Sequence, residues 1–320
     1  IPQSIWNDQF FRGRAMLDMQ GPVVLSGDDT TIDFTTQALF TGDTNPAGNE
    51  VGMQYYGPPS GAAFMYVQGD RNVIRGLDVT TGNAFGAAIA ISGNGNVVEN
   101  CTSTTVQIDG GFGGPVAAGN IVRDNTLNAV EILCWADNNT VVGNRLTHVR
   151  VEGSQYCVYP TGNRIGGPSP AQRNVVSGYG RYGEEGFPNG SQIDVVWARD
   201  TVVEGNYIGT TPDGMARQPQ IGPGGVTVRD AINTTIRGNL IAGLRTEGAN
   251  HYAGQVFGDA IALTATNADS QNTTIVGNTI GLAADGVTPI PTRRGITITP
   301  ATALRRDRSL IIGGGGPGEA

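Results

Sequence analysis

This chain of 320 residues contains no lysine, and all 20 of its basic residues are arginine. Without lysine it cannot form a Schiff base through that side chain or supply the lysine of a phosphate-binding loop. The formal net charge is −8 and no basic stripe is present, which argues against nucleic acid and anionic membrane surfaces as main partners. No run of about 20 apolar residues occurs, so no membrane-spanning segment is predicted.

Cysteine and histidine are scarce as well. The three cysteines, Cys101, Cys134 and Cys157, are too few for a disulfide framework, and their number is odd. A bridge between Cys134 and Cys157 stays open, but buried, unbridged side chains are the preferred interpretation. The two histidines, His148 and His251, lack metal-ligand spacing and are interpreted as surface residues. No cofactor is predicted, and calcium is left open without a motif to support it.

What the sequence does contain is a repeated phrase: an aliphatic residue, any residue, a small polar residue, an asparagine, any residue and a second aliphatic residue. Residues 141–146, 203–208, 236–241 and 275–280 match it, and residues 122–127 match it loosely. Recurrence at intervals of tens of residues indicates a repeat architecture. We expect the asparagines to stack at a left-handed corner, with amides bonded from coil to coil. The predicted column consists of Asn100, Asn125, Asn144, Asn206, Asn239 and Asn278.

A second pattern precedes each phrase and consists of two aliphatic residues separated by one residue. Val130 with Ile132 and Val149 with Val151 are examples. This period of two predicts strands with one buried face, and the 49 glycines suit the frequent turns between them. One coil cannot bury its aliphatic face alone, so the coils are expected to stack into a solenoid of about nine.

The order of these phrases resembles the right-handed parallel β-helix of the pectin-lyase-like superfamily. Residues 205–214, GNYIGTTPDG, resemble more narrowly the β-helix repeats of large bacterial secreted and cell-surface proteins, as do residues 173–178 and 277–281. The resemblance covers roughly residues 70–320. It implies an all-β, single-stranded right-handed parallel β-helix and an extracellular or cell-surface location.

The domain boundaries follow from where the repeats begin. Residues 1–70 are predicted to form an N-terminal cap and a first coil with a long loop over 40–61, and residues 71–320 the β-helix. The glycine-rich end is expected to break off within a repeat, because solenoids usually carry polar caps. Turn-rich inserts are predicted between the strands over residues 179–190, 209–225, 244–258 and 281–295.

The resemblance also implies where a site would lie, because enzymes of this fold generally act on polysaccharides along one outer face. The outward positions between the paired aliphatic residues include a polar file of Gln107, Glu131, Arg150 and Asp194. Glu131, Arg150 and Asp194 are the catalytic candidates: two carboxylates suit a hydrolase, and a base beside an arginine suits a lyase.

Aromatic residues follow these strands in the sequence. Trp135, Tyr156 and Trp197, together with Gln107, are the candidate ligand-binding residues, because aromatic rings stack on sugar faces. Asp213 and Asp285 precede glycines and are interpreted as parts of tight turns.

Three functions remain open. The preferred interpretation is a non-catalytic extracellular or cell-surface module for adhesion, layer formation or polysaccharide binding, since the catalytic phrases of known β-helix enzymes are missing. The alternatives are a polysaccharide lyase, hydrolase or epimerase, and a structural subunit of a larger protein assembly. The expected partner is a polysaccharide or another cell-envelope component, with protein partners in the third case.

Overall fold

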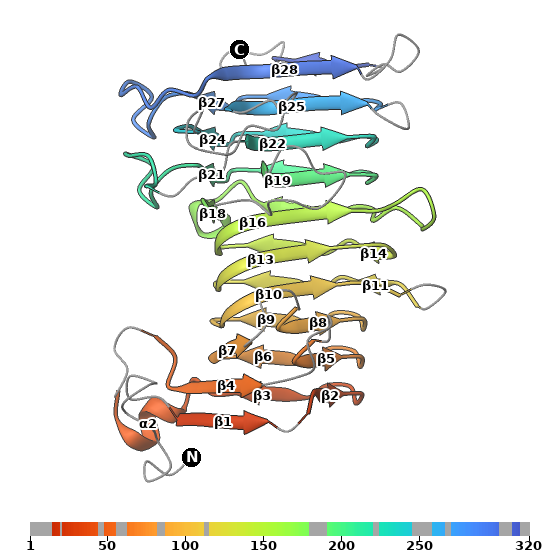
Figure 1. Ribbon diagram of the computed structural model, residues 1–320, viewed down its shortest axis with the longest axis vertical. Helices are drawn as coiled ribbons and strands as arrows, with labels where there is room; N and C mark the ends of the chain where they lie inside the picture. The colour runs from red at the N-terminus through yellow and green to blue at the C-terminus, as the bar shows by residue number, and fades with distance from the viewer. Residues whose placement is uncertain are drawn as a thin grey trace.

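The computed structural model describes residues 15–19, 21–43, 48–55, 63–81, 87–111, 115–178, 191–219, 224–244, 258–265, 270–300 and 309–313. Within these ranges nearly every element is a strand, and the strands of successive turns pair in parallel. The chain winds as a right-handed parallel β-helix, as the sequence predicted, with its turns stacked from the N-terminal to the C-terminal end (Figure 1).

One sheet receives a single strand from each turn and has ten strands, against about nine coils expected from the sequence. Its strands, in order along the stack, are β3 (Thr31–Asp33), β6 (Val73–Arg75), β9 (Val97–Glu99), β12 (Ile121–Arg123), β15 (Thr140–Val142), β17 (Arg164–Gly166), β20 (Val202–Glu204), β23 (Thr235–Arg237), β26 (Thr274–Val276) and β29 (Ile311–Ile312). We call this the ten-stranded sheet.

The opposing sheet has 17 strands, because most turns enter it with two strands. The first strands of these turns are β1 (Ala15–Met19), β4 (Val51–Tyr55), β7 (Leu77–Thr81), β18 (Val175–Val176), β21 (Tyr207–Ile208), β24 (Leu240–Ile241) and β27 (Thr279–Ile280). The second strands are β2 (Val23–Leu25), β5 (Met65–Val67), β8 (Ile89–Ile91), β19 (Ser191–Val196), β22 (Gly224–Arg229), β25 (Asp259–Ala265) and β28 (Arg294–Pro300).

Three central turns cross the 17-stranded sheet without interruption. Their long strands are β10 (Thr102–Ile108), β13 (Thr126–Ile132) and β16 (Arg145–Glu152). The outer two, β10 and β16, each pair with a strand of both shorter sets, and β13 lies between them. In later turns an insert separates the first strand from the second, so these inserts all leave the helix at the same corner. Residues 179–190 and 245–257 of the predicted inserts lie outside the described residues, as do residues 220–223 and His251.

The remaining elements are short. Strands β11 (Ala117–Ala118) and β14 (Ala136–Asp137) form a two-stranded sheet, η2 is a 3₁₀ turn at Pro170–Gln172, and α2 is one helical turn at Gln37–Thr41. The long loop predicted over residues 40–61 contains strand β4, which pairs with β7. The first coils therefore continue the same stack as the rest. At the other end, residues 314–320, which belong to the predicted broken repeat, lie outside the described residues.

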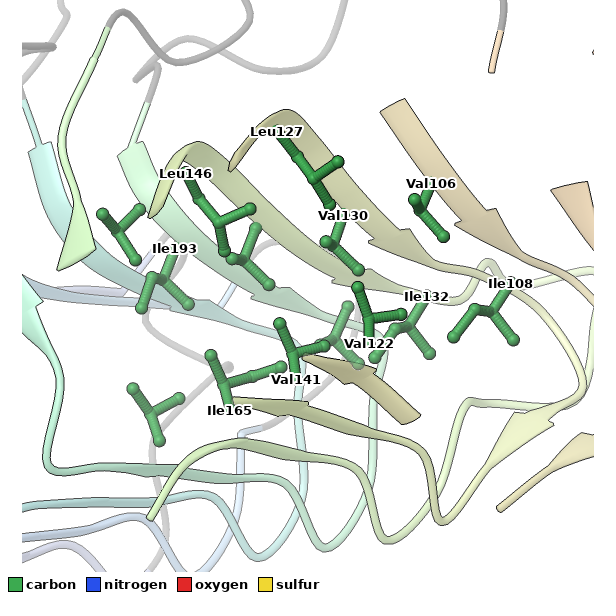
Figure 2. Packing of buried hydrophobic residues seen from close by; sticks show 14 of the residues in the cluster. Val106, Ile108, Val122, Leu127, Val130, Ile132, Val141, Leu146, Ile165 and Ile193 are labelled. Carbon is green, nitrogen blue, oxygen red and sulfur yellow. The ribbon is translucent and has the colours of Figure 1, made fainter. Parts of the chain in front are cut away.

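The core is a column of aliphatic side chains between the two large sheets. The inward rows predicted from the period of two include Val130, Ile132, Val149 and Val151, all fully buried, and they face residues such as Val141 of the ten-stranded sheet (Figure 2). Each turn covers the apolar face of the next, which is why no single coil needs a core of its own.

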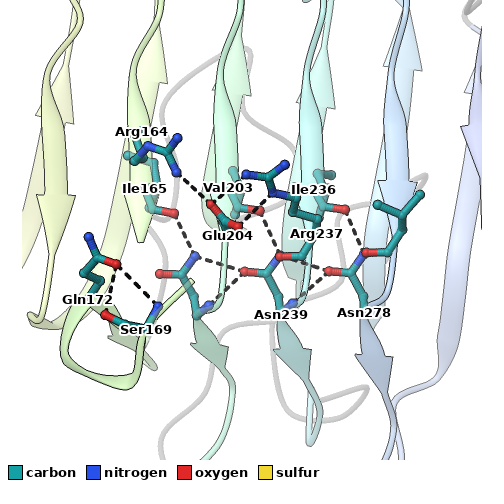
Figure 3. Close-up of polar contacts among 12 residues, drawn as sticks. Arg164, Ile165, Ser169, Gln172, Val203, Glu204, Ile236, Arg237, Asn239 and Asn278 are labelled. Atoms are coloured by element: carbon teal, nitrogen blue, oxygen red, sulfur yellow. Dashed lines mark hydrogen bonds and ion pairs between the residues drawn. The ribbon is translucent and has the colours of Figure 1, made fainter. Parts of the chain in front are cut away.

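The asparagine column lies at the corner between β12 and β13 and the equivalent corners of other turns. In each contact one asparagine Oδ1 accepts from both the backbone N–H and the Nδ2 of the asparagine in the previous turn. Asn278 Oδ1, for example, accepts from the N–H and the Nδ2 of Asn239 at 3.0 and 2.9 Å (Figure 3). Its linked members are Asn125, Asn144, Asn174, Asn206, Asn239 and Asn278.

Two details of the predicted column are wrong. Asn100 lies outside it, because the backbone N–H of Cys101, not of Asn100, donates to Asn125 Oδ1. The left-handed conformation belongs to the residue before the stacked position, such as Asn100 with φ 53° or Gly238 with φ 61°, except before Asn174, where Arg173 is extended with φ −67°. The corner therefore divides two tasks between neighbours: one residue makes the turn and the next one stacks.

A second column of stacked amides escaped the sequence analysis. Asn72, Asn96, Asn120, Asn139 and Asn163 precede the strands of the ten-stranded sheet, and each Oδ1 after the first accepts from the backbone N–H of the preceding member. In later turns Thr201, Thr234 and Thr273 follow at this corner and are also buried. The change from asparagine to threonine explains why the sequence phrase did not reveal this column.

Candidate functional site

The predicted polar file lies on the outer face of the 17-stranded sheet, along the C-terminal halves of the long strands β10, β13 and β16 and the second strand β19 that follows them. Glu131 is the register partner of Gln107 on one side and of Arg150 on the other, and Arg150 is the partner of Asp194. The four side chains therefore stand next to one another on neighbouring strands, one strand spacing of about 4.8 Å apart. Thr227, Ala262 and Thr297 continue the same row.

His148 joins this file and is the residue that sequence reasoning most clearly misjudged. It is only 4 % exposed, and its Nε2 lies 3.1 Å from Asp194 Oδ2 on the adjacent strand. The surface interpretation of His148 is therefore wrong. The alternation along β16 places His148, Arg150 and Glu152 on one side, and extending the period of two by one residue would have found it.

The charged groups of this face are more buried than ordinary surface side chains. The Arg150 and Glu152 side chains form an ion pair and are each 14 % exposed, and that of Asp194 is 15 % exposed. Burial lowers the pKa of Arg229, which stands two residues beyond Thr227, although the charges of Asp194 and Asp230 oppose this shift. Burying charge costs free energy unless it is compensated, so such a cluster on an outer face is a candidate functional site.

Neutral polar groups complete the face. Ser191 Oγ and Thr227 Oγ1 lie 2.5 Å apart across neighbouring strands, and Gln192 of β19 is fully buried. Asp259, at the start of β25, is 2 % exposed, and burial raises the pKa of its carboxyl against the opposing effects of a Thr297 hydrogen bond and nearby arginines. The polar character thus extends over several turns along the stack.

Aromatic residues border the face where its strands end. Trp135 and Trp197 occupy the corners after β13 and β19 with φ 54° and 50°, which is unusual for bulky side chains. Trp197 packs edge to face on Tyr159 at 5.6 Å between ring centroids, and the Arg199 guanidinium lies over the same Tyr159 ring. Of the predicted aromatic residues, Tyr156 is the most open, at 76 % exposed.

A disulfide holds this border together. Cys134, beside Trp135, is bonded to Cys157, which follows Tyr156, and their Cα atoms are 5.9 Å apart. The preferred sequence interpretation of both as unbridged residues is therefore wrong. The odd cysteine, Cys101, is free and buried, and burial raises the pKa of its thiol to about 11. The bridge fixes the loop that carries Tyr156 against the turn that carries Trp135.

The aspartates of the inserts serve their own turns. Asp213 Oδ1 accepts from the Thr211 hydroxyl and the Met215 N–H, and Asp285 accepts from Thr288 in the same way. Across the described ranges, no group of three or more histidine, cysteine, aspartate or glutamate side chains is arranged to hold a metal ion. Among the same residues, no helix is long and apolar enough to cross a membrane.

Comparisons with known proteins do not place this chain in a family. No protein-family model and no curated protein matches the sequence. Among solved structures, the A-modules of two Azotobacter vinelandii mannuronan C-5 epimerases are similar over 92 % and 95 % of this chain and 80 % and 88 % of theirs. Their TM-scores are 0.41 and 0.40, at 13 % and 10 % identity.

The catalytic domain of a GH87 α-1,3-glucanase is similar over 93 % of this chain and 59 % of its own length, with a TM-score of 0.36 at 11 % identity. At such identities and TM-scores these likenesses carry no argument about activity. The function has to be argued from the side chains of the site.

Proposed function

We propose that the protein is an enzyme that acts on uronate-containing polysaccharides and removes the proton next to the uronate carboxylate. The observation that carries the proposal is the contact between His148 and Asp194 within a buried, charged outer face. The sequence alone favoured a non-catalytic module because familiar catalytic phrases are missing. A buried histidine oriented by a carboxylate favours the enzyme alternative instead.

The hydrogen bond decides which nitrogen of His148 can act as the base. In a neutral imidazole, Asp194 accepts the proton of Nε2–H, which leaves Nδ1 with a free lone pair. The contact between this ring and Asp194 is made through Nε2. Once Nδ1 has taken a proton, the Asp194 carboxylate stabilises the resulting imidazolium. This pair thus has the parts of a general base.

Two arginines supply the complementary charge. Removal of the proton places negative charge on the uronate carboxylate, and Arg150 and Arg229 lie on the same outer face as the base. Burial disfavours the charged form of Arg229, and the negative charge of an incoming carboxylate would favour it, as the charges of Asp194 and Asp230 already do. Loss of the leaving sugar would then make the enzyme a lyase, and return of a proton to the opposite face an epimerase.

A hydrolase is less well supported by the same contacts. Glu131 and Asp194 are two strand spacings apart, about 10 Å, near the upper limit for a pair of carboxylates that activates water and protonates a leaving group. Asp194 is already engaged by His148, however, and a carboxylate paired in this way orients a base better than it activates water itself.

The bordering aromatic residues and the bridge fit a polymer substrate outside the cell. Trp135, Tyr156 and Trp197 provide ring faces for sugars beside the charged groups. The bridge between Cys134 and Cys157 fits an oxidising compartment, so we propose an extracellular or cell-surface location.

Solvent deuterium exchange tests the proposal, because it detects lyase and epimerase alike. Polygalacturonate and alginate are incubated with the protein in D₂O, and deuterium at the uronate ring and unsaturated ends are measured by NMR. We expect one polyuronate to react, and His148→Gln to lower the rate by about a hundredfold or more.

The control is Arg123→Gln on the ten-stranded sheet, which removes a charge remote from the base and should retain the wild-type rate. If neither polyuronate reacts, or if His148→Gln reacts as fast as the wild type while folded, the proposed function is wrong.

A further inference from the structure

Gln192 is a buried polar side chain beside the charged cluster, and it takes part in none of its ion pairs. It lies in β19 two residues before Asp194, with the inward-facing Ile193 between them. Because Ile193 pairs with Val149, Gln192 stands beside His148 on the neighbouring strand. Gln192 is 0 % exposed.

The Gln192 amide lacks partners at both ends. Within the described part of the chain, neither its Nε2 nor its Oε1 makes a hydrogen bond, although both atoms are buried. Flipping the amide, which exchanges the positions of Oε1 and Nε2, provides no hydrogen bond either, because neither position has a partner. A buried amide in this state destabilises the folded protein, since it loses its hydrogen bonds to water on folding.

Asn72 Nδ2 and Thr234 Oγ1 are buried without a partner as well, but in Gln192 both ends of the amide are unpaired, in contrast to most stacked amides of the fold. Asn120, equally buried, accepts from Asn96 and donates to Asn139 and to the Gly93 carbonyl. The chain thus satisfies its stacked amides turn after turn. At position 192 a leucine or methionine of similar volume would fill the same space without an unpaired donor and acceptor.

We propose that Gln192 is a substrate-contacting residue whose amide donates to one sugar hydroxyl and accepts from its neighbour, on the ring whose proton His148 removes. The inference rests on the proposed function and adds to it the group that reads the hydroxyls of the ring. The amide is closed to solvent in the unliganded protein, so the proposal requires that a sugar ring displaces the side chains that cover it and brings the missing hydrogen-bond partners. Its position beside His148 places those hydroxyls next to the reacting carbon.

The first test needs no substrate and compares the thermal unfolding of Gln192→Leu with that of the wild type. We expect the midpoint to rise by about 2 °C, because the substitution removes an unsatisfied amide and keeps the packing. Gln68→Leu, which alters an exposed glutamine in the turn after β5, is the matched control and should leave the midpoint nearly unchanged. A lower midpoint in Gln192→Leu would mean that the amide is already satisfied, by a buried water for instance, and would overturn the inference.

The second test measures binding through the rise in unfolding midpoint caused by oligogalacturonate, oligomannuronate or, as a neutral probe, cello-oligosaccharides. For a uronate that stabilises the wild type, we expect Gln192→Leu to bind about tenfold more weakly and Gln68→Leu to bind normally. Equal binding by Gln192→Leu and the wild type overturns the inference and leaves the proposed function standing. If no uronate stabilises the wild type, the proposed function fails first, and the inference fails with it.

Discussion

At the scale of single residues, this protein depends on amides that are satisfied by the next turn. Asn239 shows the full pattern: its Oδ1 accepts from Asn206, and its Nδ2 donates to Asn278 Oδ1 and to the carbonyl of Val203. A short side chain at a corner thereby links three turns. Truncating such a residue leaves several buried groups unpaired at once.

We therefore predict that Asn239→Ala lowers the free energy of unfolding by about 2 kcal/mol, measured by chemical denaturation. Asn128→Ala serves as a control, because Asn128 is exposed and contacts only Thr147 among the described residues. Similar small losses in both variants would show that the stacked amide contributes no more than a surface asparagine.

At Cys101 an amide can be added rather than removed, because this cysteine occupies the position in its turn that an asparagine fills in the following turns. Its Sγ lies 3.8 Å from the Ile74 carbonyl, and Asn125 in the next turn donates to the equivalent carbonyl, that of Val98. Cys101→Asn should extend the column by one turn and raise the free energy of unfolding by about 1 kcal/mol. A destabilised Cys101→Asn variant would show that this corner has no room for the longer side chain.

These residues also show what the sequence could and could not reveal. The asparagine phrase predicted a stacked column because the physics of an αL corner and an amide ladder requires those residue types in order. It misplaced Asn100 by one position, since Asn and Gly both suit the turning position that precedes the stacked one. His148 and Gln192 were missed because a lone side chain gives no periodic signal of its own; only the fold brings them beside Asp194.

At the scale of elements, neighbouring strands of the ten-stranded sheet are linked by arginine–glutamate contacts on their outer face. Glu204 on β20 lies between Arg164 on β17 and Arg237 on β23, with shortest contacts of 2.7 and 2.8 Å (Figure 3). Burial raises the pKa of Glu204, but the hydrogen bonds and charges of the two arginines outweigh it and hold the pKa below its ordinary value of 4.5.

This shift predicts a dependence of stability on pH. The pKa of Glu204 is lower in the folded than in the unfolded protein. Its ionised carboxylate therefore contributes fully to the free energy of unfolding above the unfolded-state pKa, and this contribution is lost as the pH falls through the folded-state pKa. At neutral pH, Glu204→Gln should be less stable than the wild type by about 1 kcal/mol, a modest figure because both arginines are nearly half exposed. The gap should close below pH ~4. A gap that stays constant from neutral to acidic pH would contradict the ion-pair account.

The bridge between Cys134 and Cys157 links two consecutive turns across 23 positions of sequence. A closed loop of this size is expected to contribute about 3 kcal/mol by restricting the unfolded chain. The double variant Cys134→Ser, Cys157→Ser should therefore unfold at a lower temperature, and reductant should lower the midpoint of the wild type but not of the variant. An equal response of both proteins to reductant would show that the effect does not come from this bridge.

The sequence predicted elements well where they repeat and poorly where they do not. Period-two alternation identified strands β13 and β16, because burial of one face forces that pattern. The disulfide could not be derived, since three cysteines allow several states and only the stacking of turns brings Cys134 and Cys157 to 5.9 Å. Strand β4, hidden in the predicted loop, is recognised through its pairing with β7 rather than through its own residues.

At the scale of the whole molecule, stacking turns separates two faces with different tasks. The outer face of the ten-stranded sheet carries ion pairs at half-exposed arginines, whereas the outer face of the second strands of the 17-stranded sheet carries the buried cluster around His148 and Asp194. A straight stack gives the latter face a length along which several sugar rings of a polymer can lie. Ile298 and Ile312, both about half exposed, mark the end of the described core column.

The most direct measurement is a crystal structure of His148→Gln with an oligouronate bound, since this variant should bind substrate without turning it over. The account predicts a sugar chain that runs across the strands over Arg150 and Asp194, with one ring beside residue 148 and its hydroxyls at Gln192. An oligouronate held only on the outer face of the ten-stranded sheet, or only at an end of the stack, would contradict it.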